Sequence, residues 1–314
     1  MALQKEIWIA DIQENLYQGN EFITKSIDDS EYIAFKLVHL PQSGAGSLIS
    51  INRSSLPATI IPRVDADMTY QVNEFSVDPT LITNIDILQV SYDKRMSVLR
   101  DNLLNLQDAV GSTTLYSWAP SATASRIVQT TGASMSNVLA PSATGSRKAI
   151  TLADIGKARS ILDNDNVPQT GRVLVIPADM YNAQLLAIDD VIIAYSFGTL
   201  GAAAPIPSGV VKQIFGFDIY IRPNVLVYDN AAPINALKTL NSYGKPASPA
   251  STDMVGALAY HPNFVSRALG DIKAFANEDK AEYYGSLFSA LIMHGAKYRR
   301  LDQKGICSIV QAVA

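Results

Sequence analysis

Apolar residues recur three and four positions apart in one stretch of the chain, from residue 96 to residue 110. The pattern consists of Met96, Leu99, Leu103, Leu106 and Val110, with Leu104 widening the stripe. Such spacing is typical of a helix that packs one face on a core. Gly111 follows the last apolar position, and glycine commonly ends helices. The pattern therefore predicts a helix over residues 93–110, which we expect to lie on a sheet.

Before this helix, the hydrophobic pattern changes to that of strands. Residues 32–38 and 47–51 are rich in β-branched and aromatic side chains, and the turn-forming residues 41–46 separate them. An extended two-stranded ribbon fits this order, and a ribbon alone is marginally stable. Residues 1–30 show no sustained period, so we expect an arm that needs a partner surface.

A mixed α/β unit is predicted from Thr151 onward. Thr151 and Asp154 have the spacing of a capping box, a helical stripe runs from Leu152 to Leu162, and residues 172–176 (RVLVI) predict a buried strand. Pro177 can open a second helix, because proline is tolerated at the first helical position. Residues 209–227 predict two short strands joined around Gly216.

The remaining segments are a connection, a loop and a strand-rich tail. Residues 119–150 are dominated by Ala, Ser, Thr and Gly, and an eight-residue phrase occurs at 119–126 and again, with Gly145 in place of Ala124, at 140–147. The sequence gives no physical reason for this repeat. Residues 231–252 predict a loop. The tail predicts strands at 254–260, 283–293 and 306–313, with a helical turn at 267–276.

Composition points to a protein with many contacts. Of the 314 residues, 48% are hydrophobic and only 17% charged, whereas a soluble domain usually has about a quarter charged residues. We therefore expect partners to cover much of the surface. The formal net charge of −4 gives no overall basic footprint for nucleic acid.

Neither a secretory signal nor a membrane span is expected. Residues 1–15 contain charges where a signal peptide is apolar, and residues 191–211 contain glycines and prolines that suit a loop better than a spanning helix. We expect a soluble protein of intracellular origin.

The candidate catalytic chemistry is weak. Cys307 is the only cysteine, which excludes an internal disulfide, and we expect it to be a packed apolar residue. His39, His261 and His294 are not at metal-ligand spacing. Acidic pairs occur at Asp65 and Asp67, Asp163 and Asp165, and Asp189 and Asp190, in turn-like contexts that favour local backbone bonding. We expect no catalytic residue, no cofactor and no metal, and hence no enzyme.

One basic cluster comprises Lys297, Arg299 and Arg300, with Lys304 nearby. It could meet DNA phosphates or an acidic neighbour, or be a solvated turn between strands. The acidic residues Glu278, Asp279 and Glu282 precede it and could pair with it, across the fold or between subunits.

The order of these parts resembles the Hong Kong 97-type fold of tailed-phage major capsid proteins. The resemblance is carried by residues 157–163 (KARSILD), 167–177 (VPQTGRVLVIP) with Tyr181, 214–220 (IFGFDIY) and 295–300 (GAKYRR). It covers most of residues 90–314 and, more loosely, the arm and ribbon before them.

The resemblance implies an α+β fold. Its expected parts are an N-terminal arm (1–30), an extended loop or β-ribbon (31–80) that lies over a neighbour, a peripheral domain (81–149) with a spine helix (93–110), an α/β axial domain (150–250) and a return to the peripheral domain (251–314). Some relatives crosslink through a lysine of the extended loop. Lys36 is the only lysine of this ribbon and lies near its base, so no crosslink is expected.

The function implied is a structural subunit that self-assembles into the icosahedral head shell around phage DNA. Expected partners are further copies in pentamers and hexamers, scaffold, portal and possibly decoration proteins, and weakly contacted DNA, in a virion made in the host bacterial cytoplasm. Candidate inter-subunit contacts are Lys36, Gly44, Gly46, Arg53, Arg63, Glu278, Asp279, Glu282, Lys297, Arg299 and Arg300.

Two alternatives remain at this point. An encapsulin-like compartment shares the fold and encloses cargo proteins instead of DNA. An α/β enzyme would use the acidic pairs at a concave site where two carboxylates converge.

Overall fold

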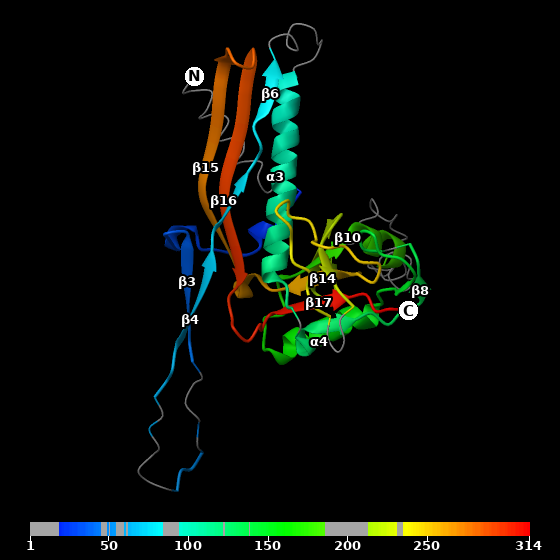
Figure 1. Ribbon diagram of the computed structural model, residues 1–314. Coiled ribbons are helices and arrows are strands. Elements are labelled where there is room, and N and C mark those ends of the chain that lie inside the picture. The colour runs from blue at the N-terminus through cyan, green and yellow to red at the C-terminus, as the bar shows by residue number, and fades with distance from the viewer. Residues whose placement is uncertain are drawn as a thin grey trace, which may run out of the picture.

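The computed structural model describes residues 19–44, 49, 51–54, 60, 62–83, 94–121, 123–137, 139–185, 213–230 and 235–314. Helices and mixed sheets combine in an α+β fold, as the sequence predicts. A long helix and hairpin extend from one end of a body that contains the larger sheet, and a thin ribbon projects in the opposite direction (Figure 1).

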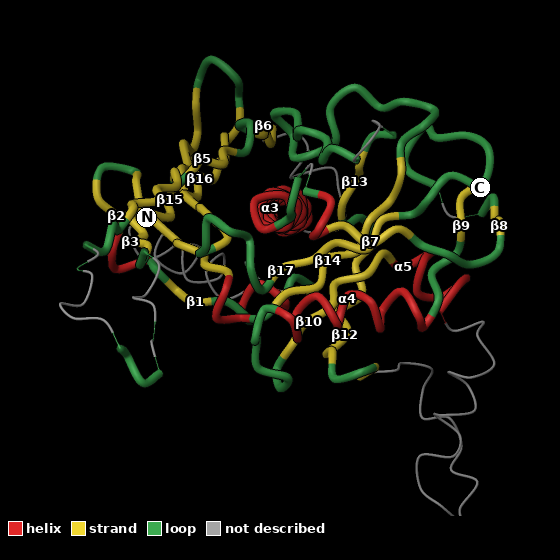
Figure 2. Tube along the Cα trace, turned by 90° about the horizontal axis from the view of Figure 1, so that it is seen from below, coloured by secondary structure: helices red, strands yellow, loops and turns green. Residues whose placement is uncertain are grey.

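Helix α3 (Lys94–Trp118) lies between the two main sheets (Figure 2). It runs past Gly111, so the predicted end at this glycine is wrong. A Cβ at Gly111 would lie 2.5 Å from Oδ1 of Asn20 and 3.0 Å from Nη2 of Arg222. The glycine therefore allows a close approach within the helix instead of ending it. The last turn buries Leu115 and Trp118, whereas Leu104, expected in the apolar stripe, is 52% exposed.

The sheet on one side of α3 is built on a long hairpin of β15 (Val265–Lys280) and β16 (Gly285–Tyr298). β16 also pairs with β5 (Asn73–Ser76) and β6 (Thr80–Thr83), and β1 (Ile27–Asp28) runs parallel to the start of β15. The helical turn expected at 267–276 is therefore wrong, because pairing with β16 on both sides of an irregularity between Leu269 and Ile272 holds that segment extended.

The sheet on the other side has seven strands, in the order β11-β12-β10-β14-β17-β7, with β13 also paired to β14. Their bounds are β7 (Ile127–Gln129), β10 (Arg172–Pro177), β11 (Gln213–Ile214), β12 (Phe217–Arg222), β13 (Leu226–Tyr228), β14 (Met254–Tyr260) and β17 (Ile306–Val310). The sheet combines strands from the expected 81–149, 150–250 and 251–314 segments.

Both faces of this sheet are covered, which explains why β10 has no polar alternation. Val173 and Val175 pack in the core around α3, whereas Leu174 and Ile176 pack on the opposite side with helix α4 (Leu152–Asn164). Alternate side chains of a strand point to opposite faces, so a strand buried on both sides is apolar throughout.

Local signals set the bounds of the shorter helices. The predicted capping box of Thr151 and Asp154 is present at the start of α4. Pro177 is the N-cap of the short helix α5 (Ala178–Met180), which continues as a π-helical turn, η4 (Tyr181–Leu185). Three 3₁₀ turns, η1 (Glu21–Thr24), η2 (Ser30–Tyr32) and η5 (Pro262–Phe264), lie near the start of the long hairpin.

The repeated phrase leads twice to a buried arginine. Arg126 ends the 3₁₀ turn η3 (Ala124–Arg126) and pairs with Asp165. Arg147 opens β9 (Arg147–Lys148), which pairs with β8 (Ser134–Met135), and its guanidinium donates to four backbone carbonyls. After Arg126 the backbone pairs with β17 at residues 308–310, and at Arg147 and Lys148 it pairs with residues 312–313, which follow β17. The two copies thus anchor two successive connections to β17 and the segment after it.

The ribbon consists of β2 (Ile33–Ala34), β3 (Leu37–Gln42) and β4 (Ala66–Gln71). The expected return strand at 47–51 is wrong for its described residues, which are not in a strand, because residues 66–71 pair with β3 instead. At the base Val38, Leu40, Met68 and Tyr70 form a small core with Ala268 of β15. Among the described residues, the contacts of the ribbon with the long hairpin therefore lie at its base.

Candidate assembly surfaces

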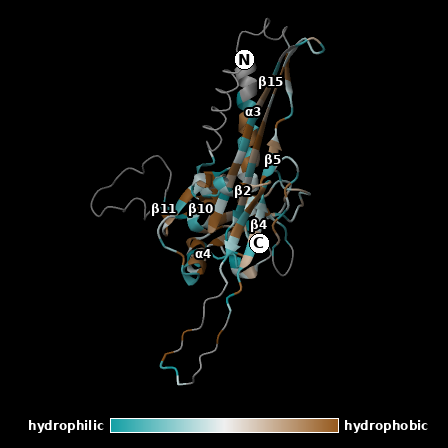
Figure 3. Cartoon of the chain, turned by 90° about the vertical axis from the view of Figure 1, so that its left-hand side faces the viewer, coloured by the Kyte–Doolittle hydropathy of each residue, from teal (hydrophilic) through white to brown (hydrophobic). Residues whose placement is uncertain are grey.

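The outer part of the ribbon carries aliphatic side chains that no described part of the chain covers. The exposed fractions are 92% for Ile49, 87% for Ile51, 92% for Ile60 and 79% for Val64. These four residues are called the tip residues below. Figure 3 shows the ribbon projecting clear of the body. Apolar side chains gathered on a projection indicate a contact with another molecule.

Just below the tip, the two legs of the ribbon approach closely at Gly44. A Cβ at this residue would lie 2.0 Å from the carbonyl oxygen of Val64, so glycine is required for the contact. Gly44 N donates to Oδ1 of Asp65 at 2.8 Å, and Arg63 Nε donates to the same oxygen at 2.5 Å. These bonds lower the pKa of Asp65, the Arg63 bond most. Gly44 and Arg63 thus shape the ribbon itself.

A strained turn joins β2 and β3 at the base of the ribbon. Phe35 and Lys36 form a two-residue turn with φ of 49° and 64°. Both values lie in the left-handed region, which hairpin turns normally fill with asparagine and glycine. Phe35 is fully exposed, and Lys36 Nζ lies 3.3 Å from a carboxylate oxygen of Glu74. An exposed aromatic ring on a strained turn is a second candidate contact.

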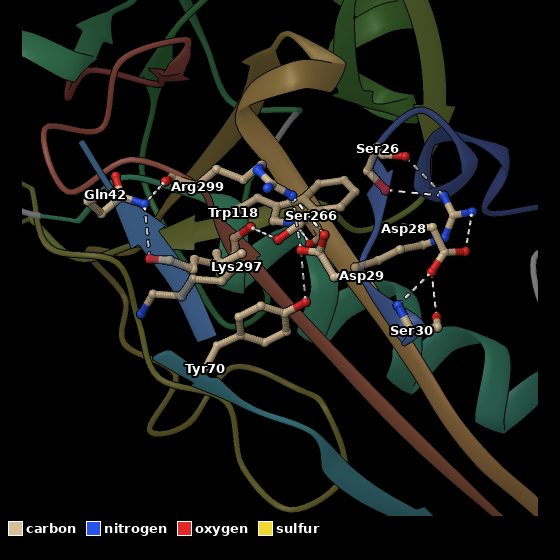
Figure 4. Close-up of polar contacts among 12 residues, drawn as sticks. Ser26, Asp28, Asp29, Ser30, Gln42, Tyr70, Trp118, Ser266, Lys297 and Arg299 are labelled. Atoms are coloured by element: carbon tan, nitrogen blue, oxygen red, sulfur yellow. Dashed lines mark hydrogen bonds and ion pairs between the residues drawn. The ribbon is translucent and has the colours of Figure 1, made fainter. Parts of the chain in front are cut away.

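Where the ribbon meets the body, Asp29 and Arg299 form an ion pair (Figure 4). Arg299 Nη1 lies 2.8 Å and 3.0 Å from the two carboxylate oxygens of Asp29, whose side chain is 4% exposed. Each ribbon strand contributes one bond to these two residues, one to the carboxylate of Asp29 and one to the backbone of Arg299. Tyr70 Oη of β4 donates to Asp29 at 3.4 Å, and Gln42 Nε2 of β3 donates to the carbonyl oxygen of Arg299 at 2.6 Å. These four residues are called the junction cluster below.

Around the junction cluster, the start of β15 ties three elements together. Arg267 donates to the carbonyl oxygen of Ile23 at 2.7 Å and pairs with Asp28 at 3.2 Å. Trp118 Nε1, at the end of α3, donates to the carbonyl oxygen of Ser266 at 2.9 Å. The segment around β1, the helix and the hairpin therefore form a connected base for the ribbon.

The predicted basic cluster is divided among separate partners. Arg299 belongs to the junction cluster, whereas Arg300 and Lys304 both pair with Asp302 on the surface. Lys297 lies 5.1 Å from the centre of the Tyr298 ring. Charge in this cluster is thus compensated in part within the chain, since Asp29 pairs with Arg299 and Asp302 is shared by Arg300 and Lys304.

The expected pairing of this cluster with the acidic residues across the fold is wrong. Glu278 and Asp279 lie at the end of β15, and Glu282 lies in the turn before β16. Lys297 lies at the opposite end of β16, whose 14 residues span roughly 45 Å at about 3.3 Å per residue. Pairing between subunits stays a prediction.

Among the other predicted contacts, Arg53 is exposed and Gly46 lies outside the described residues. Sequence reasoning missed Asp29, Gln42, Tyr70, Phe35 and the tip residues as a group. The exposed isoleucines carried a usable signal, since apolar residues in a segment rich in glycine, proline and serine have no local core to join.

The acidic pairs that lie in the described part of the chain have structural partners. Asp65 binds Arg63, and His39 Nδ1 lies 2.7 Å from Asp67. Asp163 pairs with Arg172, and Asp165 with Arg126. Asp189 and Asp190 lie outside the described residues.

Two further candidate side chains are buried. Burial lowers the pKa of His294 to about 4 and raises the pKa of Cys307 to about 12. Within the described ranges, no three His, Cys, Asp or Glu side chains group to hold a metal ion. Those ranges also contain no helix long and apolar enough to cross a membrane.

Comparison with known proteins finds solved structures with a similar fold. No family model and no curated protein matches the sequence. A solved structure from Mycobacterium phage Che8 is similar, with 16% identity, a TM-score of 0.61 and coverage of 92% of this chain and 90% of that one. The capsid structure of cyanophage P-SCSP1u gives 19% identity, a TM-score of 0.57 and coverage of 92% and 86%.

A virus-like particle from Pyrococcus furiosus is also similar, with 10% identity, a TM-score of 0.54 and coverage of 98% of this chain and 99% of that one. The resemblance to tailed-phage capsid proteins is thereby confirmed at the level of the fold. The chain has the fold from which phage capsids and this particle are built.

Proposed function

We propose that this chain is the major capsid protein of a tailed phage, a structural subunit that closes with further copies into the head shell. The observation that carries the proposal is the projecting ribbon, whose tip residues no described part of the chain covers. A subunit that buries such a projection on its neighbour gains stability only on assembly. Similarity to solved phage capsids over about nine-tenths of the chain supports the same function.

The partners follow from this role. Copies assemble as pentamers and hexamers, and scaffold, portal and decoration proteins complete a virion made in the host bacterial cytoplasm. A formal net charge of −4 suits a shell that holds packed DNA weakly, since tight binding needs many uncompensated cations. Arg300 and Lys304 share Asp302, which offsets part of their positive charge and agrees with a weak contact.

A second candidate is a protein compartment that encloses cargo proteins. The similarity to the Pyrococcus furiosus particle, which covers nearly all of both chains, favours this alternative. Both candidates are shells without catalysis by this chain, and they differ in their contents.

Particle formation tests the proposal. Purified protein is examined by light scattering and electron microscopy, and particles from the native source are assayed for nuclease-protected DNA. Closed particles with DNA are expected. Closed particles that hold protein alone would select the compartment, and a monomer or dimer under all salt conditions would refute both shells.

The ribbon is tested with the triple variant Ile49→Ser, Ile51→Ser, Ile60→Ser. We expect an unchanged unfolding temperature, because these side chains pack on no described residue, together with loss of particles. The matched control is Tyr243→Ser, which removes a residue that is 75% exposed away from the ribbon. Equal loss of particles in both variants would mean that the ribbon has no special role.

A further inference from the structure

The junction cluster joins three parts of the chain that lie far apart in sequence. Asp29 lies between β1 and η2, Arg299 follows β16, and Gln42 and Tyr70 belong to the two long strands of the ribbon. Asp29 and Arg299 are separated by 270 positions. The ion pair is bonded to β4 through Tyr70, and the backbone carbonyl of Arg299 accepts a bond from Gln42 of β3, so the two paired residues hold both strands of the projection.

We propose that the Asp29–Arg299 pair is a latch that fixes the direction of the ribbon, and that this direction controls which particles form. The proposal rests on the proposed function, because it concerns how subunits meet. Asp29 and Arg299 act here as positioning residues and not as contacts with a neighbour.

The first argument is geometric. The apolar base of the ribbon packs on Ala268 of β15 and on Met293 and Tyr298 of β16, and non-directional apolar contacts allow small rotations. The bonds from Gln42 and Tyr70 are directional and lie on different strands, at 2.6 Å and 3.4 Å from their acceptors. The ion pair ties together the two residues that accept these bonds, so a rotation of the ribbon about its base would stretch the bonds and the latch resists it.

The second argument concerns charge. Asp29 is buried, and a buried carboxylate that loses its cation is strongly destabilised. The backbone around it is held as well, since Asp29 N donates to the carbonyl oxygen of Arg267 at 2.8 Å. The carboxylate therefore cannot follow a displaced Arg299, and the pair is either closed or broken. Such two-state elements, unlike elastic ones, give discrete subunit shapes.

The third argument is selectivity within the basic cluster. Arg300 is adjacent in sequence, but its Nε lies 3.1 Å from Asp302, in a local pair that touches neither ribbon strand. The two neighbouring arginines carry equal charge but differ in partner, since Arg299 pairs with the buried Asp29, which also binds the ribbon through Tyr70, and Arg300 pairs with the more exposed Asp302. The chain supplies its own matched control.

The experiment compares Arg299→Gln with Arg300→Gln. Hydrogen exchange of the unassembled chain is measured in peptides covering β3 and β4, with peptides of α4 and β10 as the internal test of folding. The latch predicts at least tenfold faster exchange in β3 and β4 for Arg299→Gln only, with α4 and β10 unchanged. Asp29→Asn should reproduce this result, and Arg299→Lys, which keeps the charge, should restore part of the protection.

Particle diameters are then measured by electron microscopy. Arg299→Gln is expected to give a mixture of diameters and open sheets, whereas Arg300→Gln keeps the single diameter of the unmodified protein. Unchanged ribbon exchange, equal changes in both variants, or a loosened ribbon with unaltered particles would each overturn the proposal. If the unmodified chain forms no particles, the proposed function fails and the latch has no role in assembly, while the exchange data still show whether the pair holds the ribbon.

If Arg299→Gln loses the protection of α4 and β10 as well, Arg299→Lys replaces it in both measurements. A lysine keeps the positive charge near Asp29 but forms fewer directional bonds. Intermediate ribbon exchange with a partly broadened diameter would support the latch, and exchange equal to that of the unmodified chain would contradict it.

Discussion

The side-chain amide of Asn20 donates a hydrogen bond to the carbonyl oxygen of Gln107, 2.9 Å away inside helix α3. The same asparagine occupies the space where a side chain at Gly111 would begin. A short polar residue near the start of the chain thus contacts the helix through a gap that only glycine leaves open.

Substitution by alanine should therefore change the free energy of unfolding in opposite directions at two helical glycines. Gly111→Ala would place Cβ 2.5 Å from Asn20 Oδ1, so we expect a loss of roughly 1–3 kcal/mol in the free energy of unfolding. In α4, no heavy atom lies within 4 Å of the Cβ position of Gly156, and Gly156→Ala should add about 0.5–1 kcal/mol. Denaturant unfolding of both variants measures the difference, and equal signs would contradict it.

The turn at Phe35 and Lys36 stores strain that better turn residues should release. Replacing Phe35 with asparagine and Lys36 with glycine introduces two residues that favour the observed φ of 49° and 64°. We expect the free energy of unfolding to rise by about 1–2 kcal/mol. Hydrogen exchange of β2 and β3 measures the local effect of the double substitution. Exchange rates equal to those of the unmodified chain would show that the turn is not strained.

Acid should destabilise the fold through His294. Burial is the main cause that lowers its pKa in the folded state to about 4, from 6.5. Between these pH values the unfolded chain binds a proton that the native chain does not, so stability falls as the pH drops from 6.5 to 4. The loss reaches about 3 kcal/mol at about 1.4 kcal/mol per pKa unit. His261, also lowered by burial, acts in the same direction.

Denaturant unfolding at a series of pH values measures this slope. His294→Gln should flatten the slope between pH 6.5 and 4, because glutamine does not titrate. A slope as steep as that of the unmodified chain would assign the acid sensitivity to other groups.

Cys307 should resist alkylation while the protein is folded. Burial raises its pKa to about 12, and the thiolate is the reactive form. At pH 8 we expect no adduct with iodoacetamide by mass spectrometry, and full reaction in denaturant. Reaction of the native chain at the rate of a free thiol would show that β17 opens readily.

Patterns within short segments predicted the fold best. The strand expected at 254–260 has the observed bounds of β14, and the capping box of Thr151 and Asp154 is local by nature. Gly111 was misread as a helix end because the close neighbours that require glycine there, Asn20 and Arg222, lie far from it in sequence. The return strand was misplaced because residues 47–51 are as apolar as a strand, although residues 66–71 pair with β3.

The candidate site was less accessible to prediction. The role of Arg299 depends on Asp29, and nothing in the residues around either one indicates the other. Charge pattern alone grouped Arg299 with Arg300, whereas the fold assigns them to different partners. Burial of Asp29, which makes the pair important, is a property of the assembled tertiary structure.

The place of β17 inside its sheet has a consequence for synthesis. β17 is the last strand in sequence order, yet it lies between β14 and β7. β7 ends at Gln129 and β17 begins at Ile306. At a translation rate of about 5–20 residues per second, β17 is therefore synthesised roughly ten to thirty seconds after β7. Until then the core beneath α3 is open, and a chain that stalls before β17 cannot complete it. Only a chain that has been translated through β17 can therefore complete this core and become a subunit that meets its neighbours.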